Sequence, residues 1–404
     1  MQHVISLPKR NLKCEPLLQF HVDGDPVCFS TSGVGNAARG LLDAISSCDS
    51  SVGITCCVSK DAPETEWLAA FRTRPNITVK RLLLSKRQRN MLEVLGFPVV
   101  DVPERRAGSV ALYLYPRVPG ANRAPQLCIV HDLSSVRMPE QSSMPWHGIV
   151  INKKALKEGK RRNVQFIACS RFTQVDLAGY LDIRQEDITQ IYWGVDRQWS
   201  DLSSDLLCGA VCRKYSILGT YFIWYGQITP RKNIPNLLRA YASAYRLYGE
   251  GFPDLVLVGA RGESDCGTLT PTELGIAHKV RTLPSMELPD LVALVSGAVA
   301  LVFPSWYEGF GLPVIEALTL GTPVLLSNRA ALPEIAGPAC LLFDPADVED
   351  IARQLGRAAS EVERLRTSAN LEGRAWAARF SFGAAARTIL SLARKALDQD
   401  GSNV

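Results

Sequence analysis

The sequence lacks the marks of several protein classes. It contains no internal repeat and no low-complexity tract, and its 45 Lys and Arg against 40 Asp and Glu leave a net charge of only +5. Charged residues make up 21% and hydrophobic residues 47%, as in ordinary globular chains. This composition excludes a disordered, collagenous or coiled-coil protein. So mild a charge also gives no reason to expect nucleic acid as a partner.

Zinc-type cysteine pairs and long apolar runs are missing too. Several of the eleven cysteines lie inside apolar runs, which favours buried thiols in a reducing compartment. Residues 291–307 carry no charge, but these 17 positions are fewer than the roughly 20 apolar residues of a membrane span. Residues 1–13 show no apolar core of a signal peptide. We therefore expect a cytoplasmic protein, soluble or peripheral to the inner face of the membrane.

Short apolar runs alternate with helical patterns along the chain. This alternation predicts parallel sheets that helices cover on both faces. Strands are expected at residues 17–22, 52–58, 110–115, 127–130, 165–168, 188–192, 221–225, 255–258, 280–283, 300–304, 324–327 and 340–343. Helices are expected at residues 36–45, 234–247, 288–297, 312–320 and 348–358.

The series of strands restarts near residue 221, after a more polar segment at residues 196–218. We therefore predict two doubly wound, Rossmann-like α/β domains, residues 1–200 and 201–381, that face each other across a cleft. An amphipathic helix at residues 382–398 is expected to return to the first domain. Ligands of such sheets bind at the carboxyl ends of the strands.

Residues 305–316 are the most informative segment. A glycine turn at residues 309–311 separates a strand pattern from a helix pattern that has Pro313 in its first turn. Free N–H groups and the helix dipole make such a start an anion site. Glu316 is the only charge in the apolar helix, so it needs hydrogen-bond donors: the vicinal hydroxyls of a ribose, a backbone group or an arginine. Glu308 lies just before the turn, where it could contact the group attached to a phosphate bound at this helix start.

A second constellation follows the strand at residues 221–225. A turn at Gly226 leads to Arg231 and Lys232, directly before a predicted helix. Cations oppose the helix dipole at that position, and a bound anion would remove the conflict. The pair is therefore a candidate phosphate site, with an ordinary solvated Arg-Lys pair as the alternative.

Two motifs of the first half point to the same cleft. Gly33-Val34-Gly35-Asn36 resembles the start of a dinucleotide fingerprint, but the nearest acid, Asp61, comes about 28 residues after Gly33, against the usual 20 or so. A glycine loop that touches a phosphate or sugar fits the motif equally well. His131 ends another predicted strand, where it is either structural or a donor and proton carrier for a sugar.

Two basic segments lie in the first half, at residues 80–89 and 151–162. Each is either a solvated face or a contact with an anionic membrane surface or a pyrophosphate-linked acceptor.

These motifs together resemble the retaining GT-B glycosyltransferases of family four, the group 1 glycosyltransferases. The strongest match is the pair Glu308 and Glu316 within EGFGLPVIEALTLGTPVLLSN, followed by YGQITPRKNIPNLLRAY, SGVGNAARGLL, IVHDLSSVRMPE and IACSRFTQVDLAGYL. The resemblance covers about residues 17–398. Asn36 departs from it, since many relatives carry Arg there. The HDLSS…MPE stretch is similar to the mannosyl- and rhamnosyl-transferring branch.

The resemblance implies a nucleotide-sugar donor, held mainly by residues 201–381, and an acceptor on the side of residues 1–200. The resemblance implies that Arg231 and Lys232 hold the diphosphate and that Glu316 binds the ribose hydroxyls. It also implies that Glu308 and His131 contact the donor sugar. The expected donor-site residues are Gly226, Arg231, Lys232, Gly309, Phe310, Gly311, Leu312 and Glu316. The expected acceptor and phosphate loop is Gly33, Val34, Gly35 and Asn36.

The activity implied is retaining transfer of a hexose, mannose favoured, from GDP-mannose to a glycan or lipid-linked acceptor of cell-surface polysaccharide or lipopolysaccharide. No metal and no cofactor are expected, because Arg, Lys and a helix dipole neutralise the leaving diphosphate. The alternatives are a UDP- or dTDP-sugar donor, a sugar-nucleotide epimerase, an NAD-dependent dehydrogenase that uses Gly33-x-Gly35, and a binding protein without catalytic activity.

Overall fold

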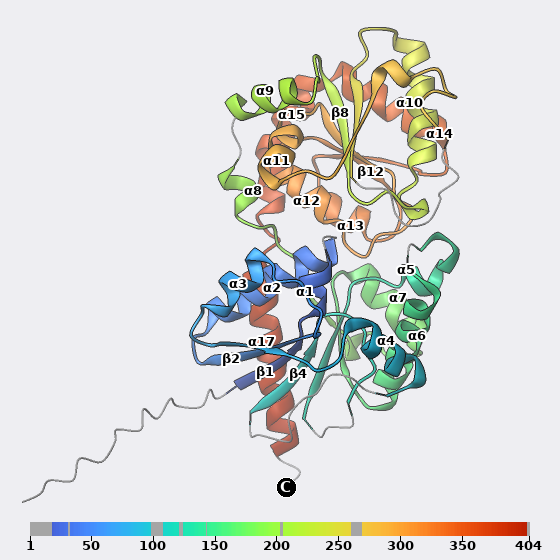
Figure 1. The fold of residues 1–404 in the computed structure, drawn as a ribbon. Coiled ribbons are helices and arrows are strands. Elements are labelled where there is room, and N and C mark those ends of the chain that lie inside the picture. Colours follow the sequence, from blue (N-terminus) through green and yellow to red (C-terminus); the bar gives the residue numbers. More distant parts are fainter. Residues whose placement is uncertain are drawn as a thin grey trace, which may run out of the picture.

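The computed structural model describes residues 18–30, 33–97, 108–120, 124–142, 144–202, 205–259 and 269–401. They form two α/β domains stacked end to end, the N-terminal one below and the C-terminal one above in Figure 1. Residues 1–13, with the predicted absence of a signal peptide, lie outside these ranges. Within them, no helix combines the length and apolar character that crossing a membrane requires.

The N-terminal sheet is parallel throughout and has the order β3-β2-β1-β4-β5-β6-β7. The strand order reverses between β1 and β4, because β2 and β3 lie on one side of β1 and β4 to β7 on the other, and this is the topological switch point of the sheet. The strands are β1 (Leu18–Asp23), β2 (Val52–Val58), β3 (Ile77–Arg81), β4 (Ser109–Tyr113), β5 (Gln126–Val130), β6 (Gln165–Ala168) and β7 (Thr189–Gln190). Its helices are α1 (Asp25–Phe29), α2 (Gly33–Cys48), α3 (Glu66–Arg72), α4 (Lys86–Leu95), α5 (Ser134–Arg137), α6 (Trp146–Arg161) and α7 (Arg171–Leu181), with short turns η1 (Pro139–Gln141) and η2 (Gln185–Asp187).

The C-terminal sheet is also parallel, in the order β10-β9-β8-β11-β12-β13, with its switch point between β8 and β11. The strands are β8 (Tyr221–Tyr225), β9 (Asp254–Val258), β10 (Val280–Leu283), β11 (Ala300–Phe303), β12 (Val324–Ser327) and β13 (Cys340–Phe343). The helices after residue 197 are α8 (Gln198–Asp201), α9 (Asp205–Lys214), α10 (Ile234–Tyr248), α11 (Leu288–Gly297), α12 (Leu312–Thr319), α13 (Leu332–Ala336), α14 (Val348–Ser360), α15 (Val362–Ser368), α16 (Arg374–Ala377) and α17 (Phe382–Gly401), with turns η3 (Pro230–Lys232), η4 (Ala277–Lys279) and η5 (Ala369–Gly373).

Burial explains the continuous apolar runs of the sequence. Strands β4, β8, β11 and β12 are buried along their whole length, as expected for parallel strands between two helical layers. Helix α17 crosses back and packs against α2 of the first domain (Figure 1). A Cβ on Gly40 of α2 would lie 2.4 Å from the Phe382 ring, so only glycine admits the helix so closely.

Two elements differ from the sequence-based expectations. Strand β3 was not predicted, because in ITVKR only Ile77 is buried and the remaining positions are exposed or half-buried, which hides the apolar signal of this edge strand. The strand expected at residues 188–192 is reduced to the two residues of β7, since Ile191 already belongs to the segment that leads toward the C-terminal domain.

Candidate active site

The predicted donor residues gather where β8 and β11 end. Gly226 follows β8 directly, and its φ of +141° is a backbone conformation that residues other than glycine rarely adopt. The segment after β11 carries Glu308 and the glycine turn, and Trp306 N–H donates to the Arg231 carbonyl at 2.9 Å. Because both segments leave the sheet at its switch point, they line the place where this type of sheet binds ligands.

Arg231, Lys232 and Glu308 form a buried ion cluster. Arg231 Nη1 lies 2.8 Å from Glu308 Oε2, and Lys232 Nζ lies 2.6 Å from Glu308 Oε1. Burial raises the pKa of Glu308, but the charges of Arg231 and Lys232 outweigh it and lower that pKa to about 2. Burial lowers the pKa of Lys232, although Glu308 opposes this shift. Two cations against one carboxylate leave a local positive charge beside the glycine turn, which suits an anionic ligand.

The glycine turn opens helix α12 as the sequence predicts. Gly311 has a φ of +103° and stands directly before the helix, and Pro313 lies in its first turn. Leu312, the first helical residue, lies 3.7 Å from the Cβ position of Gly33 in the N-terminal domain. Helices α12 and α2 therefore begin close to each other, and both present their positive N-terminal ends to the space between the domains.

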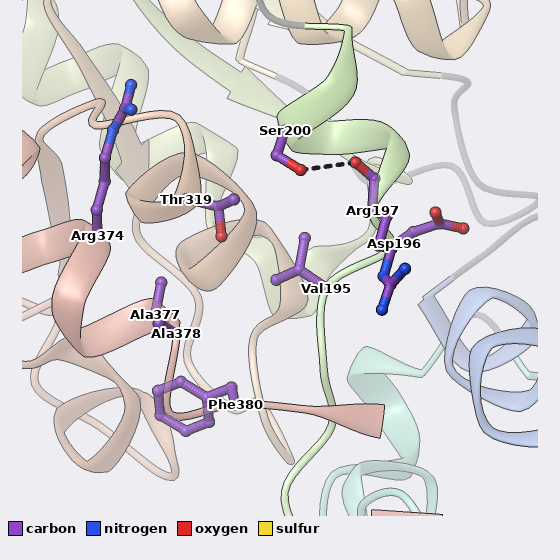
Figure 2. Close-up of a pocket in the computed structure, with 9 residues that line it drawn as sticks. All are labelled: Val195, Asp196, Arg197, Ser200, Thr319, Arg374, Ala377, Ala378 and Phe380. Carbon is purple, nitrogen blue, oxygen red and sulfur yellow. Dashed lines mark hydrogen bonds between the residues drawn. The ribbon is translucent and has the colours of Figure 1, made fainter. Parts of the chain in front are cut away.

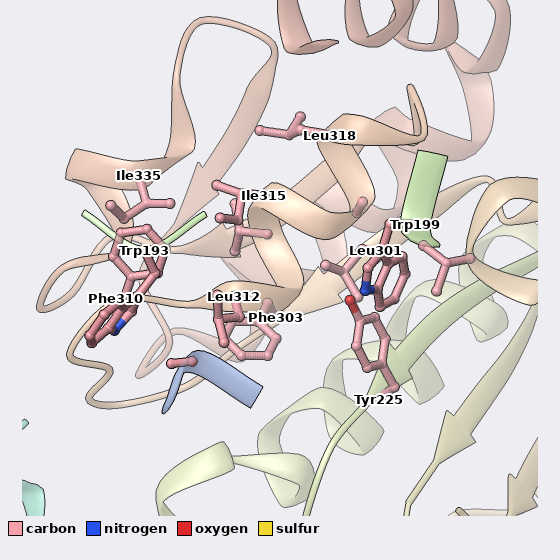
Figure 3. Packing of buried hydrophobic residues seen from close by; sticks show 14 of the residues in the cluster. Trp193, Trp199, Tyr225, Leu301, Phe303, Phe310, Leu312, Ile315, Leu318 and Ile335 are labelled. Carbon is pink, nitrogen blue, oxygen red and sulfur yellow. The ribbon is translucent and has the colours of Figure 1, made fainter. Parts of the chain in front are cut away.

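Glu316 is buried on α12 and has no cationic partner among the residues that the structure describes. The Tyr225 hydroxyl at the end of β8 donates to its Oε2 at 2.6 Å, and Trp199 stacks on the Tyr225 ring with centroids 6.0 Å apart (Figure 3). Burial raises the pKa of Glu316 to about 7, although the hydrogen bond from Tyr225 counteracts the rise. One oxygen is thus fixed by Tyr225, and no described side chain donates to the other. Sequence reasoning missed Tyr225, whose position just before Gly226 was the available signal.

We predict that Glu316→Gln stabilises the protein at alkaline pH. With a pKa of about 7 folded against 4.5 unfolded, the buried carboxyl favours the folded state below pH 4.5, and this advantage is lost as the pH rises through 7. The difference of about 2.5 units corresponds to about 3 kcal/mol above pH 7. Thermal unfolding at pH 4 and pH 8 measures it: the variant should gain stability at pH 8 only.

Glu308→Gln serves as the matched control with the opposite sign. Its carboxylate has a lowered pKa, so it stabilises the fold above pH 4.5 and loses that contribution as the pH falls toward 2. The glutamine variant should therefore be less stable than the wild type at pH 8. Equal unfolding midpoints for Glu316→Gln and the wild type at pH 8 would contradict the raised pKa of Glu316.

His131 lies on the N-terminal side of the same space. Its Nε2 is 2.9 Å from the Leu114 carbonyl oxygen, which only accepts, so Nε2 carries the proton and Nδ1 remains an acceptor. Burial lowers the pKa of His131, which keeps the ring neutral at physiological pH. The ring stacks on Trp193 with centroids 5.3 Å apart. His131 is therefore held as a neutral acceptor.

The glycine turn contacts the N-terminal domain directly. A Cβ on Gly309 would lie 1.8 Å from the His131 carbonyl oxygen, so the two backbones cross in contact. Cys169 Sγ and Thr173 Oγ1 each donate to the carbonyls of both His131 and Gly309. Sequence reasoning missed this role of Cys169 and Thr173, because the segment IACSRFTQVDLAGYL carries the family resemblance without indicating a role for either residue.

Glu334 forms a second bridge between the domains. Its carboxylate accepts the N–H groups of Arg171 and Phe172 at 2.8 and 3.1 Å, at the start of α7, and the Tyr192 hydroxyl at 2.7 Å. The sequence alone could not reveal this bridge, because all three partners lie more than 140 residues away from Glu334. Together with the Gly309 crossing, this bridge holds the two domains in a closed arrangement.

The structure has a helix where an acceptor and phosphate loop was predicted. Gly33, Val34, Gly35 and Asn36 form the first turn of α2 and are not a free loop. Gly35 packs so tightly that a Cβ would lie 2.2 Å from the Ser30 carbonyl oxygen. Asn36 Oδ1 accepts from Arg39 at 2.5 Å. Gly33 nonetheless stands opposite Leu312, so the motif does lie across from the donor segment.

The basic segment at residues 80–89 is also corrected in part. Arg89 is fully buried and pairs with Asp23 and Asp25, so it is not available to a surface partner. Arg81 donates to the Ala62 carbonyl and pairs with Glu64. In the segment at residues 151–162, Lys153, Lys154, Lys157, Lys160 and Arg161 are exposed on or at the end of α6.

A separate cavity lies where the chain crosses between the domains (Figure 2). Its lining combines the segment before and within α8 with the end of α12 and the region of α16. The lining residues are Val195, Asp196, Arg197, Ser200, Thr319, Arg374, Ala377, Ala378 and Phe380. None of them belongs to the predicted site, so the cavity gives no support to the predicted donor residues.

Comparison with known proteins identifies the C-terminal domain. Residues 219–374, which contain Gly226, the Arg231–Lys232 pair and both glutamates, match the family described as glycosyl transferases group 1. The match covers this domain and does not extend to the N-terminal sheet. O-antigen chain mannosyltransferase B of Escherichia coli is 31% identical over 254 residues, 62% of this chain and 65% of that protein. MMP alpha-(1->4)-mannosyltransferase of Mycolicibacterium hassiacum is 34% identical over 171 residues, 42% of this chain and 41% of that protein.

The matched regions span less than two thirds of either relative. Among solved structures, Anabaena Alr3699/HepE in complex with UDP and glucose superposes with a TM-score of 0.69 at 16% identity, over 93% of this chain and 99% of that one. At this identity the likeness concerns the fold alone. The chain therefore has the two-domain GT-B fold that the sequence predicted.

Proposed function

We propose that this glycosyltransferase transfers mannose, with retention of its anomeric configuration, from GDP-mannose to a glycan or lipid-linked acceptor. The observation that carries the proposal is that a cationic cluster, a helix start and a buried carboxylate lie in one segment. Among the described residues this carboxylate, Glu316, has no cationic partner. Arg231 and Lys232 pair with Glu308, four residues before α12 begins, and Glu316 lies about one turn inside that helix. The diphosphate and ribose of a nucleotide sugar complement these groups, because the diphosphate is an anion and the ribose carries two vicinal hydroxyl donors.

Each residue takes one part of the donor. Arg231 and Lys232 bind the diphosphate, assisted by the N–H groups of Gly311 and Leu312. The Glu316 carboxylate accepts the ribose hydroxyls, while Tyr225 holds its other oxygen. Gly226 allows the backbone after β8 to approach the nucleotide. Phe310 is packed against Tyr192 and Phe380 and supports the turn from behind.

Glu308 and His131 act at the donor sugar. Because its pKa is lowered to about 2, Glu308 is ionised and too weak a base to remove a proton at neutral pH. It therefore serves as an acceptor for sugar hydroxyls while it orients Arg231 and Lys232. His131, neutral with Nδ1 unprotonated, accepts a further hydroxyl from the opposite domain.

The reaction proceeds on one face of the sugar. The bond from the anomeric carbon to the phosphate oxygen breaks, the acceptor oxygen bonds to the same face, and the acceptor's proton passes to the leaving phosphate. The two cations and the dipole of α12 stabilise the charge that develops on the diphosphate, so no metal is required.

Mannose is favoured because the relatives named above are mannosyltransferases, one of them for an O-antigen chain. GDP is the nucleotide that the resemblance of the HDLSS…MPE stretch to the mannosyl-transferring branch implies. We accordingly place the reaction in cell-surface polysaccharide or lipopolysaccharide synthesis, on the cytoplasmic side of the membrane. A UDP- or dTDP-linked sugar is the alternative donor. A dehydrogenase or a binding protein would leave the Arg231–Lys232–Glu308 cluster without a role.

A thermal-shift panel tests the donor. GDP-mannose and GDP are expected to raise the unfolding midpoint in the presence of EDTA, and the UDP, ADP and dTDP sugars to leave it unchanged. Proton NMR of the product then gives the anomeric configuration, expected to be that of the donor. A shift with UDP sugars alone would replace the donor, and an inverted product would reject the retaining mechanism.

A further inference from the structure

Two thiols of helix α9 face the first residue of strand β8. Cys208 and Cys212 stand four residues apart, so they lie on the same side of the helix. Their sulfur atoms are 3.8 Å apart, and both side chains are half-buried. The hydroxyl oxygen of Tyr221, which begins β8, lies 4.0 Å from Cys208 Sγ and 3.7 Å from Cys212 Sγ. The two sulfurs and the oxygen therefore form a nearly equilateral triangle.

The size of this triangle fits a metal ion with tetrahedral coordination. Zinc binds thiolates at about 2.3 Å, so two sulfur ligands of one tetrahedral zinc ion are about 3.8 Å apart. The separation of the Cys208 and Cys212 sulfurs has this value, and the distances from both sulfurs to the Tyr221 oxygen are close to it. Thiolate sulfur is also the ligand that selects soft ions over magnesium or calcium. The triangle thus has the dimensions of one face of a zinc-type tetrahedron.

Gly297, the last residue of helix α11, leaves room beside the triangle. Helix α11 packs against α9 (Figure 1). A Cβ on Gly297 would lie 2.2 Å from Cys208 Sγ and 3.0 Å from the Tyr221 oxygen, so a side chain here would fill the space next to both atoms. Gly297 is exposed, which gives an ion a path from solvent. The Tyr221 hydroxyl donates its proton to the Leu294 carbonyl at 2.8 Å, so its oxygen keeps lone pairs for a further partner.

We propose that Cys208, Cys212 and Tyr221 bind one thiophilic divalent ion of the zinc or cadmium type, with water as the fourth ligand. Each thiol releases its proton to solvent, so both sulfurs bind as thiolates. The described residues contain no cluster of three or more His, Cys, Asp or Glu side chains that could hold a metal, so this site depends on both cysteines. Tyr221 begins β8, whereas the proposed sugar-nucleotide site follows the other end of that strand. The ion therefore ties α9 to β8 and takes no part in the proposed transfer.

Titration of the full, reduced and metal-free chain with cadmium chloride tests the proposal, because cadmium thiolates absorb in the ultraviolet. The wild type is expected to bind one more ion per chain than Cys208→Ser/Cys212→Ser. Each single serine variant should weaken this binding at least about 100-fold, since even the partners of metal ligands contribute about 10- to 100-fold. Cadmium should raise the unfolding midpoint of the wild type more than that of the double variant, and zinc should compete for the site. Cys48→Ser, which removes an exposed thiol elsewhere, is the matched control and should bind like the wild type.

Gly297→Ala tests the space beside the sulfurs while both thiols remain, and it should weaken cadmium binding at least about tenfold. Loss of one ion and of its thiolate absorption in the cysteine variants, with retention in Cys48→Ser, supports the proposal. Equal cadmium binding by the wild type and Cys208→Ser/Cys212→Ser overturns it, and so does an equal loss in Cys48→Ser. If Gly297→Ala does not fold, the cysteine variants decide, because serine is no larger than the half-buried cysteine that it replaces.

Discussion

Lys232→Ala is expected to lower kcat/KM for the donor about 100- to 1000-fold, the usual effect of removing one preorganised group that stabilises developing charge. Lys232 Nζ lies 2.6 Å from Glu308, and only 13% of the Lys232 side chain is exposed, so little water screens its charge. The loss should appear mainly in kcat, because the diphosphate gains negative charge as it leaves. Glu308 keeps Arg231 as a partner, so the variant should remain folded.

Lys214→Ala is the matched control for this variant. Lys214 also pairs with a carboxylate, Asp290, at 2.5 Å, but it lies exposed on the surface of the protein. Its replacement should leave kcat/KM unchanged. Full activity in Lys232→Ala, measured by steady-state kinetics with the unfolding midpoint in parallel, would remove Lys232 from the site.

Gly309→Ala is expected to lower kcat at least about 100-fold, because a misplacement of about 1 Å can cost that much. The new Cβ would lie 1.8 Å from the His131 carbonyl oxygen and 2.7 Å from the Asp132 Cβ. This clash lies between the domains, so they can relieve it only by moving apart. The segment of Gly309 and Glu308 would then move away from His131, while each domain kept its own core.

Small-angle scattering and kinetics measure this effect together. The radius of gyration of Gly309→Ala should exceed that of the wild type, with little change in the unfolding midpoint. Gly179→Ala is the control: no atom lies within 4 Å of its Cβ position on α7, so activity and radius should stay as they are. A Gly309→Ala enzyme with wild-type kcat would show that the crossing with His131 does not serve the reaction.

The sequence predicted the fold well where burial is complete. Strands β2, β6, β8, β10, β12 and β13 have the expected bounds, and most of their apolar runs lie between two helical layers. Edge strand β3 escaped notice because its exposed charges break the apolar pattern. Strands β10 and β13 were predicted although most of their residues are half-buried or exposed, so complete burial is not needed for a strand to be recognisable.

The site could be predicted in part for a related reason. Glycines and charges at strand ends marked Arg231, Lys232, Glu308 and Glu316, since their positions follow from where strands stop. Their pairing could not be predicted, because Glu308 meets Lys232 across 76 residues of sequence. The same holds for Arg89, which belongs to a basic run but is buried by acids that lie 64 and 66 residues earlier.

The central claim is that the edge between the domains binds a nucleotide-sugar donor through Arg231, Lys232 and Glu316. Calorimetric titration of GDP-mannose into the wild type and Glu316→Ala tests it most directly. The account predicts one site per chain, an affinity about 10- to 100-fold weaker in Glu316→Ala because charged hydrogen bonds to the ribose are lost, and no change in Lys214→Ala. Equal affinities in all three proteins, or no binding of any nucleotide sugar by the wild type, would contradict it.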